Sequence, residues 1–405
     1  MNDSSDIVIV GGGHAAAQLC AGLADAGRGA QVRLVCEEDV LPYQRPPLSK
    51  AFLKNTEEVV QPHRAESWFA DAGIRLHLAD PAITIDRAAQ TLSLRTGKLL
   101  RYHRLVLATG TRARRLPHLP EHLDNVAVLR HADDAARLRR QMHAAQHLTV
   151  LGGGFIGLEI AATARVLGKT VTVLESAPRL LMRSVSPEIA EHVLASHRAA
   201  GVDVRLGVAV GGFEFDNQRL HKLAVDGVPE AVELLVLAVG AAPEEGLARA
   251  AGLDCANGIV VDAFMQTSDP AILAIGDCTS FPEPGSGRRL RLESVQNAND
   301  QARTALATLL GTPAPYTALP WFWSEQASLR LQMAGLLPAG ATRALRPGAN
   351  AGSFSVLHYL GERFVCIESV NAAMDHVMSR KLLEAGKSPP LAAACDPAVP
   401  LKRWL

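Results

Sequence analysis

Two stretches of the chain share one order of apolar and polar positions. The first runs through the apolar residues IVIV at 7–10, the turn GGGH, a helical segment at 15–27 and a second apolar run at 31–38. The second repeats this order between residues 148 and 176, as LTVL, GGGF, IGLEIAATARVLG and TVTVLES. Apolar strands that alternate with helices predict parallel sheets of the doubly wound α/β class.

Further apolar segments complete the predicted architecture. RLVLATG at 104–110 and ELLVLAVG at 233–240 each end in glycine, and we expect them to be the return strands of the two sheets. After about residue 313 the pattern becomes aromatic and short-stranded, in PWFWSEQ, LRLQMAGL, SFSVLHYL and RFVCIESV. This texture predicts a third, α+β domain with a mostly antiparallel sheet. GTPAPYTALP, at 311–320, is the expected linker.

Composition and charge restrict the class of protein. The chain has 405 residues, 48% of them hydrophobic and 20% charged, which describes a packed protein of two or three domains. Lys+Arg and Asp+Glu balance at 41 each, so no overall charge attracts nucleic acid or an anionic membrane. The first residues, MNDSSD, do not resemble a secretory signal, and no run approaches the length that spans a bilayer. We therefore expect a cytoplasmic protein.

Six cysteines are scattered without a CxxC pair or metal-ligand spacing, at Cys20, Cys36, Cys255, Cys278, Cys366 and Cys395. This pattern is typical of reduced thiols, and it argues against a zinc or iron–sulfur site. No metal ligands are expected.

The glycine turns predict dinucleotide binding. In each copy the first position allows a tight strand-to-helix turn, the second lets the backbone approach a pyrophosphate, and the third permits helix-on-strand packing. The phosphates would lie at a helix N-terminus, where free N–H groups favour negative charge. In that order the pairs are Gly11 and Gly152, Gly13 and Gly154, and Ala16 and Gly157. One such turn alone could be a tight turn and nothing more, whereas two in full context indicate two dinucleotides.

Acidic residues follow each turn at the spacing expected of a ribose ligand. Glu175 ends the second strand of the second copy, and Glu37 and Glu38 end that of the first. A carboxylate there accepts hydrogen bonds from a ribose diol and repels a 2′-phosphate, so the second site should prefer NADH over NADPH. The alternative for Glu175 is a solvated carboxylate at a strand end. Two dinucleotides in one chain most economically mean a flavin and a nicotinamide.

The sequence resembles, end to end, the FAD-dependent, NADH-linked ferredoxin reductases of bacterial oxygenase systems, of the putidaredoxin reductase and biphenyl dioxygenase reductase type. Two of the segments that carry the resemblance are specific to this family, PPLSKAFL at 46–53 and PWFWS at 320–324. The others are LVLATG at 105–110, GGGFIGLEIAATA at 152–164, QTSDPAILAIGDC at 266–278 and ESVQNANDQAR at 293–303.

The resemblance implies FAD and NADH as cofactors and a glutathione-reductase-like arrangement of two Rossmann-like domains plus a C-terminal α+β domain. Residues 1–112 and 245–312 would form the FAD-binding domain, residues 113–244 the NADH-binding domain and residues 313–405 the C-terminal domain.

The resemblance also implies roles for single residues. Asp277 would bind the ribityl hydroxyls of FAD, and Lys50, paired with Glu159, would lie beside the flavin N5 and stabilise negative charge there. Without the resemblance these would be a turn Asp and two surface side chains. Glu37, rather than Glu38, would take the adenosine ribose. Further FAD contacts are implied at Ala15, Ile83, Arg130, Val295 and Trp323.

Two features remain open at this stage. Trp321 and Trp323 could flank the flavin ring or belong to the core. Many relatives carry Pro–Asn where this chain has Pro243 and Glu244, which puts the detail of that return loop in doubt.

The absence of one cysteine pair bears on the reaction. Disulfide reductases of this superfamily carry two cysteines, and NADH peroxidases one, in the region that here reads DVLPYQRPPLSKAFLKN. Cys36 is more consistent with a small buried side chain than with a redox centre. Electrons should therefore leave the flavin directly for a one-electron partner such as a [2Fe–2S] ferredoxin.

Ferredoxins of this kind are generally acidic, so we expect a basic docking patch, with Arg288–Arg291 or residues 112–115 as candidates, although solvated loop arginines are the alternative. A redox-switched binder of the apoptosis-inducing-factor type, or a reductase for rubredoxin, a nitrite-reductase partner or oxygen, remain alternatives.

Overall fold

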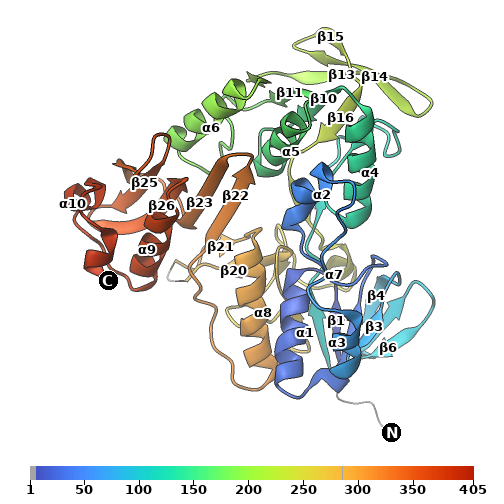
Figure 1. Ribbon diagram of the computed structural model, residues 1–405. Coiled ribbons are helices and arrows are strands. Elements are labelled where there is room, and N and C mark those ends of the chain that lie inside the picture. Colours follow the sequence, from blue (N-terminus) through green and yellow to red (C-terminus); the bar gives the residue numbers. More distant parts are fainter. Residues whose placement is uncertain (1–5, 285) are drawn as a thin grey trace. The chain divides into compact units, whose positions relative to one another are not determined.

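A computed structural model describes residues 6–284 and 286–405 (Figure 1). The chain divides into two compact units. The first unit contains Met1–Arg45, Val59–Arg112 and Ala241–Ala318, and the second contains Pro46–Glu58, Ala113–Gly240 and Leu319–Leu405. Part of the N-terminal hexapeptide MNDSSD lies outside the described residues. None of the described helices has the length and apolar character needed to cross a membrane.

A five-stranded parallel sheet forms the centre of the first unit, in the order β19-β7-β1-β2-β3. The chain runs outward from β1 through β2 to β3 on one side and through β7 to β19 on the other. The strand order therefore reverses beside the carboxyl end of β1, which is where doubly wound sheets bind ligands. The strands are β1 Ile7–Val10, β2 Val32–Val35, β3 Arg75–His77, β7 Arg104–Leu107 and β19 Ile272–Ala274.

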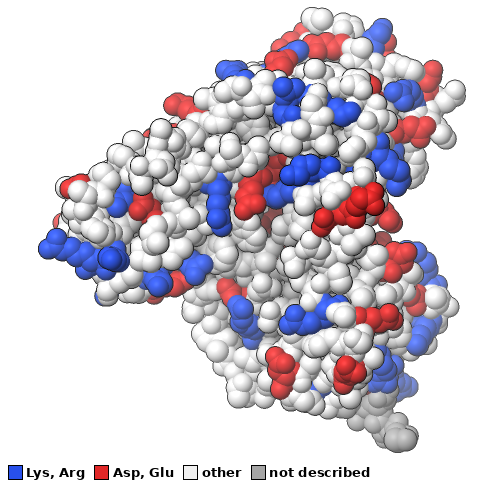
Figure 2. All heavy atoms as spheres, in the orientation of Figure 1, with Lys and Arg blue, Asp and Glu red and all other residues white. Residues whose placement is uncertain are grey.

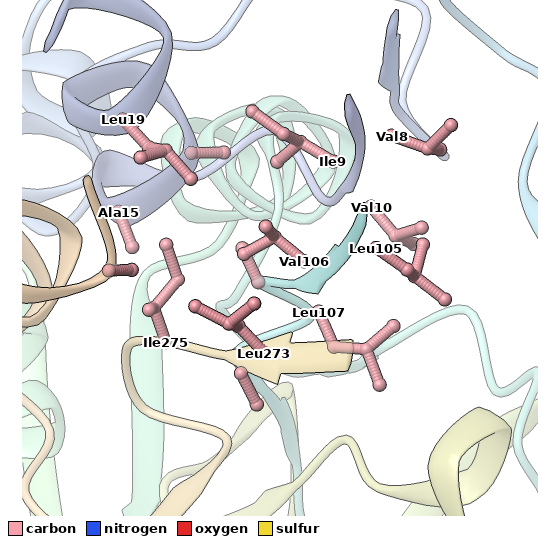
Figure 3. Close-up of a cluster of buried hydrophobic side chains, with 14 of the residues drawn as sticks. Val8, Ile9, Val10, Ala15, Leu19, Leu105, Val106, Leu107, Leu273 and Ile275 are labelled. Carbon is pink, nitrogen blue, oxygen red and sulfur yellow. The ribbon is translucent and has the colours of Figure 1, made fainter. Parts of the chain in front are cut away.

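Apolar runs bury both faces of this sheet. Ile9, Leu105 and Val106 have no exposed surface, because helices cover the sheet and continuous apolar strands suit a doubly covered parallel sheet. Helices α1 (His14–Asp25) and α8 (Val295–Leu309) pack side by side (Figure 1). Figure 3 shows the side chain of Leu19 on α1 pointing toward those of β1, β7 and the segment after β19.

Smaller elements complete the first unit. β4, β5 and β6 form an antiparallel meander, β18, β20 and β21 form a three-stranded sheet, and β17 pairs with β8. Their bounds, with those of the short helices, are β4 Ala82–Asp86, β5 Thr91–Leu94, β6 Leu99–Arg101, β8 Thr111–Ala113, β17 Ala241–Pro243, β18 Ile259–Val260, β20 Thr279–Pro282, β21 Arg289–Leu290, η1 Gly29–Gln31, α3 Glu66–Asp71 and α7 Gly246–Ala250.

The second unit repeats the design of the first, with a parallel sheet in the order β12-β11-β10-β16-β9. The reversal now lies beside β10. An antiparallel meander of β13, β14 and β15 is inserted before β16. The elements are β9 Val126–Ala127, α4 Ala132–Ala144, β10 His147–Leu151, α5 Phe155–Val166, β11 Thr170–Glu175, α6 Pro187–Ala199, β12 Val202–Leu206, β13 Val210–Asp216, β14 Arg219–Val225, β15 Val228–Ala231 and β16 Leu234–Leu237, with η2 Pro46–Ser49 and α2 Ala51–Lys54.

The C-terminal part of the second unit is an antiparallel sheet in the order β22-β23-β26-β25-β24. Helix α9 packs on β23 and β26 (Figure 1). The elements are β22 Trp321–Gln326, β23 Leu329–Gly335, β24 Thr342–Pro347, β25 Phe354–Leu360, β26 Arg363–Val370, α9 Ala373–Glu384, α10 Leu391–Cys395 and η3 Leu401–Trp404.

The predicted fold class is confirmed, since two dinucleotide-type parallel sheets accompany a C-terminal antiparallel sheet. Three details differ from the sequence expectation. Strand β24 was not predicted, because TRALRP at 342–347 lacks a clear apolar alternation. The two return strands lie inside their sheets, since β19 and β9 form the edges beyond them. Cys36, which belongs to the apolar run at 31–38 that predicted the second strand, follows β2, because the strand ends at Val35.

Candidate active site

The two glycine turns have matching backbone geometry. Gly11 has φ +118° and Gly152 has φ +113°. Residues other than glycine rarely adopt these backbone angles. A Cβ atom would lie 2.2 Å from the carbonyl oxygen of Ala108 at Gly11, and 2.4 Å from that of Ala238 at Gly152. Both turns therefore require glycine, because the chain passes close to the end of the neighbouring strand.

The two helix N-termini after these turns are open. Gly13 caps α1 and Gly154 caps α5, and glycine has no side chain to bond the first free N–H groups. Apart from the adjacent residues and nearby helix backbone, no described atom lies within 4 Å of the position that a Cβ would take at either residue. The arrangement fits a pyrophosphate at each helix end, where N–H groups and the helix dipole favour negative charge. Ala16 is fully buried, and a Cβ at Gly157 would lie 2.3 Å from the oxygen of Gly152, so both third positions pack helix on strand.

The acidic residues after β2 have different surroundings. Glu38 accepts hydrogen bonds from the hydroxyl of Tyr43 at 2.8 Å and from Arg45 at 3.0 Å. Glu37 is exposed to solvent. The carboxylate of Glu37 is thus the more accessible of the two, and its role as the ribose ligand stays a prediction.

A cavity of 770 Å³ lies at the carboxyl ends of the second unit's strands. Its lining includes the glycine turn, the acid after β11 and two arginines that sequence reasoning did not single out: Gly152, Gly153, Gly154, Glu175, Arg179 and Arg183. The Glu175 carboxylate accepts hydrogen bonds from the backbone N–H groups of Gly153 at 2.6 Å and Ala177 at 2.7 Å. These two bonds fix the orientation of the carboxylate at the cavity wall.

An ion pair joins Lys50 and Glu159 within the second unit, as the family resemblance implied. Lys50, directly after η2, donates from Nζ to Oε2 of Glu159 at 2.6 Å. Glu159 lies on α5, five residues after the helix N-cap, and its side chain is 5% exposed, against 23% for that of Lys50. A buried carboxylate with a partly exposed cation leaves the cation as the group that a ligand can reach.

Two serines complete the coordination of Glu159. Ser49 donates from its hydroxyl to Oε2 at 2.5 Å, and Ser324 on β22 donates to Oε1 at 2.7 Å. Thr163, one turn after Glu159, donates to the backbone oxygen of Ser49 and so ties the η2 segment to α5. Sequence reasoning missed both serines, although each belongs to a motif that carried the resemblance, PPLSK or PWFWS.

The two tryptophans of β22 stack on each other, since residues two apart in a strand share a face. The ring centroids of Trp321 and Trp323 are 5.5 Å apart. Trp321 also lies under the guanidinium of Arg380 and beside His376. Both indoles are partly exposed, and Trp321 also packs against the hydrophobic core of the C-terminal sheet.

The remaining residues with an implied FAD contact occupy several elements. In the first unit, Ala15 on α1 lies against Gly276, the neighbour of Asp277, and Val295 is the first residue of α8. Ile83 on β4 is 51% exposed. Arg130 follows β9 in the second unit, where its backbone N–H bonds to Asp134.

The cysteines of the described chain are all unpaired, and four of them are buried. Burial raises the pKa of the Cys36 thiol to about 12, and it also raises the pKa of Cys20 and Cys278. Thiols that stay protonated at neutral pH are poor nucleophiles. No set of three or more His, Cys, Asp or Glu side chains within residues 6–284 and 286–405 is arranged to hold a metal ion.

The arginines expected at a docking patch are largely engaged within the fold. Arg289 donates to the backbone oxygens of Val261 and Ser280, both at 2.9 Å. Arg291 pairs with a glutamate, and its side chain is 14% exposed. Arg288 is 68% exposed. Figure 2 shows Lys and Arg interspersed with Asp and Glu on the visible face.

Comparisons with known proteins cover the chain almost completely. The family model of pyridine nucleotide-disulphide oxidoreductases matches residues 5–302, and the reductase C-terminal model matches residues 321–405. Rhodocoxin reductase of Rhodococcus erythropolis is 40% identical over 96% of this chain and 92% of its own.

Two solved structures are similar along the same length. The ferredoxin reductase for the CYP199A2 system from Rhodopseudomonas palustris has a TM-score of 0.93 and 40% identity, over 98% of this chain and 99% of that chain. The covalent putidaredoxin reductase–putidaredoxin complex gives a TM-score of 0.93 and 38% identity, over 98% and 97%.

Proposed function

The chain belongs to the pyridine nucleotide-disulphide oxidoreductase family, and we propose that it is the reductase of an oxygenase system, which passes electrons from NADH through FAD to a [2Fe–2S] ferredoxin. The observation that carries this proposal is the full-length similarity to reductases of redoxin proteins, C-terminal domain included. When bound, FAD accepts two electrons from NADH and can release them one at a time.

FAD belongs to the first glycine turn in this proposal. Gly11 and Gly13 admit its pyrophosphate, Glu37 binds the adenosine ribose and Asp277 binds the ribityl hydroxyls. The N-terminus of α1 supports this assignment, since Gly13 supplies no side-chain cap and the positive end of the helix dipole favours the phosphates. The family resemblance implies further contacts with FAD at Ala15, Ile83, Arg130, Val295 and Trp323.

NADH belongs to the cavity of the second unit. Gly152 and Gly154 admit its pyrophosphate, and Gly157 keeps α5 close to β10. Glu175 accepts from the ribose diol with the lone pairs that its two backbone bonds leave unused, because a carboxylate can accept about four hydrogen bonds. The same negative charge repels the 2′-phosphate of NADPH.

Lys50 is the catalytic cation and Glu159 its partner. By the family resemblance Lys50 would lie beside the flavin N5, where a fixed positive charge would stabilise negative charge on the ring. The buried carboxylate of Glu159 holds the ammonium in place through a 2.6 Å ion pair. Water is kept from the inner side of this pair because Glu159 is 4% exposed.

The electrons leave without a protein thiol. The six cysteines are free thiols, which are already reduced, and the described residues form no disulfide that could accept electrons, so a docked one-electron partner must receive them directly. We assign residues 1–112 and 245–312 to FAD binding, 113–244 to NADH binding and 313–405 to the C-terminal domain, in a cytoplasmic protein.

The decisive experiment mixes the FAD-loaded protein with NADH and a purified [2Fe–2S] ferredoxin under anaerobic conditions. We expect two ferredoxins to be reduced for each NADH consumed. A protein that takes electrons from NADH but reduces only rubredoxin or oxygen would contradict the choice of partner. A long-lived charge-transfer complex with slow dye reduction would instead support the redox-switched binder.

A further inference from the structure

Within the second unit, a row of buried hydrogen bonds leads away from the Lys50–Glu159 ion pair. Beyond Ser324, which donates to Glu159, the side-chain amide of Gln326 donates to the Ser324 hydroxyl at 3.3 Å. The ring Nε2 of His197 lies 2.8 Å from Oε1 of Gln326. The row thus connects the carboxylate on α5 with the last turn of α6, by way of two side chains on one face of β22.

All donors in this row point toward the carboxylate. Gln326 presents its oxygen to His197, and an amide oxygen only accepts, so Nε2 of His197 must carry the proton. The Gln326 NH₂ group then donates to the oxygen of Ser324, and the Ser324 hydroxyl donates its single hydrogen to Glu159. Hydrogen bonds that share one direction polarise one another, so each link strengthens the next.

Burial gives this row its importance. The exposed fractions are 4% for Glu159, 0% for Ser324, 2% for Gln326 and 3% for His197. Water cannot readily replace a lost partner at such sites, and an unsatisfied buried polar group is costly. Oε2 of Glu159 already serves Lys50 and Ser49, so Ser324 is the donor that fixes Oε1 and with it the rotation of the carboxylate.

We propose that Ser324, Gln326 and His197 are positioning residues for the Lys50–Glu159 pair, through which the C-terminal sheet sets the place of the Lys50 ammonium. This inference rests on the proposed function. The carboxylate of Glu159 keeps a single orientation because Ser324 donates to it. Ser324 donates toward Glu159 because its oxygen accepts a hydrogen bond from Gln326, which is itself held by His197.

The test uses the FAD-loaded protein and the variants S324A, S324T and H197F. Ser355→Ala is the matched control, because Ser355 is a fully buried serine of the same sheet whose hydroxyl bonds to Ser369 instead of Glu159. Stopped-flow reduction by NADH gives the limiting rate and the Kd for NADH separately. Dye equilibration gives the midpoint potential of the bound FAD without any turnover.

We expect S324A to lower the limiting rate about tenfold, because one hydrogen bond to a buried charge is lost and a loss of that size changes a rate by about this factor. The Kd for NADH should change by less than about twofold. The midpoint potential should become more negative, since the cation is no longer held in one place. S324T, which keeps the hydroxyl, should restore both values, and H197F should give a smaller change of the same sign.

Two results would be decisive against these claims. An S324A protein that matches S355A in limiting rate and midpoint potential overturns the positioning role. If NADH does not reduce the wild-type protein at all, the proposed function fails instead, and the midpoint potentials of S324A and S355A still decide whether Ser324 positions the pair.

Discussion

The Nζ atom of Lys50 lies 2.6 Å from Oε2 of Glu159, although 109 residues separate the two along the chain. Each residue would ordinarily lie at a protein surface. Here the glutamate is buried, and removing one partner of a buried pair leaves a charge without compensation. A buried pair of this kind marks a candidate functional site, and its role is tested first.

Replacing Lys50 with Met should slow flavin reduction by NADH about tenfold or more, because the cation that stabilises developing negative charge is lost. Stopped-flow absorbance of the FAD measures this rate. K54M is the matched control, since Lys54 is an exposed lysine of the adjacent helix α2. Equal rates in K50M and wild type would remove Lys50 from the reaction.

Replacing Glu175 with Ala should raise the NADPH/NADH ratio of kcat/KM by about 10- to 100-fold, which corresponds to about 1–3 kcal/mol for an unmatched polar contact. The repulsion of the 2′-phosphate disappears with the carboxylate. E175Q is the control for the local turn, because its remaining oxygen can still accept from Gly153. A ratio that stays constant in E175A would place Glu175 outside the ribose site.

A variant with all six cysteines replaced by Ala or Ser should keep its NADH-to-ferricyanide turnover, provided that it folds and binds FAD. The reason is that buried thiols with raised pKa values, such as Cys36 at about 12, supply no nucleophile. The FAD content per chain is the control for folding. Normal FAD binding together with lost dye reduction would show that electrons pass through a thiol.

Lowering the pH from 7 to 5 should destabilise the protein. Burial lowers the pKa of His376 to about 4 in the fold, so between pH 6.5 and 4 the unfolded chain binds a proton that the native state does not. The contribution of His376 to the free energy of unfolding is therefore fully present above about pH 6.5, and up to about 3 kcal/mol of it is lost as the pH falls to about 4. His63, His77, His192 and His197 shift in the same direction.

Thermal unfolding at several pH values measures this loss. H376Q should flatten the dependence of Tm on pH, whereas H103Q, at an exposed histidine, should leave it as in the wild type. An unchanged slope in H376Q would mean that burial does not lower the pKa of His376 below its value in the unfolded chain.

Ferredoxin reduction should weaken as salt rises, because opposite charges are screened over a Debye length of about 8 Å at physiological ionic strength. R288Q should reduce this dependence while sparing ferricyanide reduction. Arg289 is left intact, since its bonds to Val261 and Ser280 hold the fold. A salt dependence that is identical in R288Q and wild type would place the docking surface elsewhere.

The sequence by itself determined the two dinucleotide units. Strand, glycine turn and helix are set by residues close together in the chain, and the steric demand at Gly11 and Gly152 acts on neighbouring backbone. The family resemblance, through PPLSKAFL around Lys50 and GGGFIGLEIAATA around Glu159, also predicted the ion pair, because it relates residues that periodicity cannot.

Only the tertiary structure decided what surrounds that pair. Ser324 lies 165 residues from Glu159, and His197 lies 129 from Gln326, so their hydrogen bonds exist only once α5, α6 and β22 pack together. The tertiary structure also decided which arginines bond within the fold. The sequence shows a basic run at 288–291, but it does not show the backbone carbonyl groups that accept hydrogen bonds from Arg289. Patterns of neighbouring residues determine the strands, turns and helices, whereas the packing of those elements determines which polar side chains form hydrogen bonds with one another.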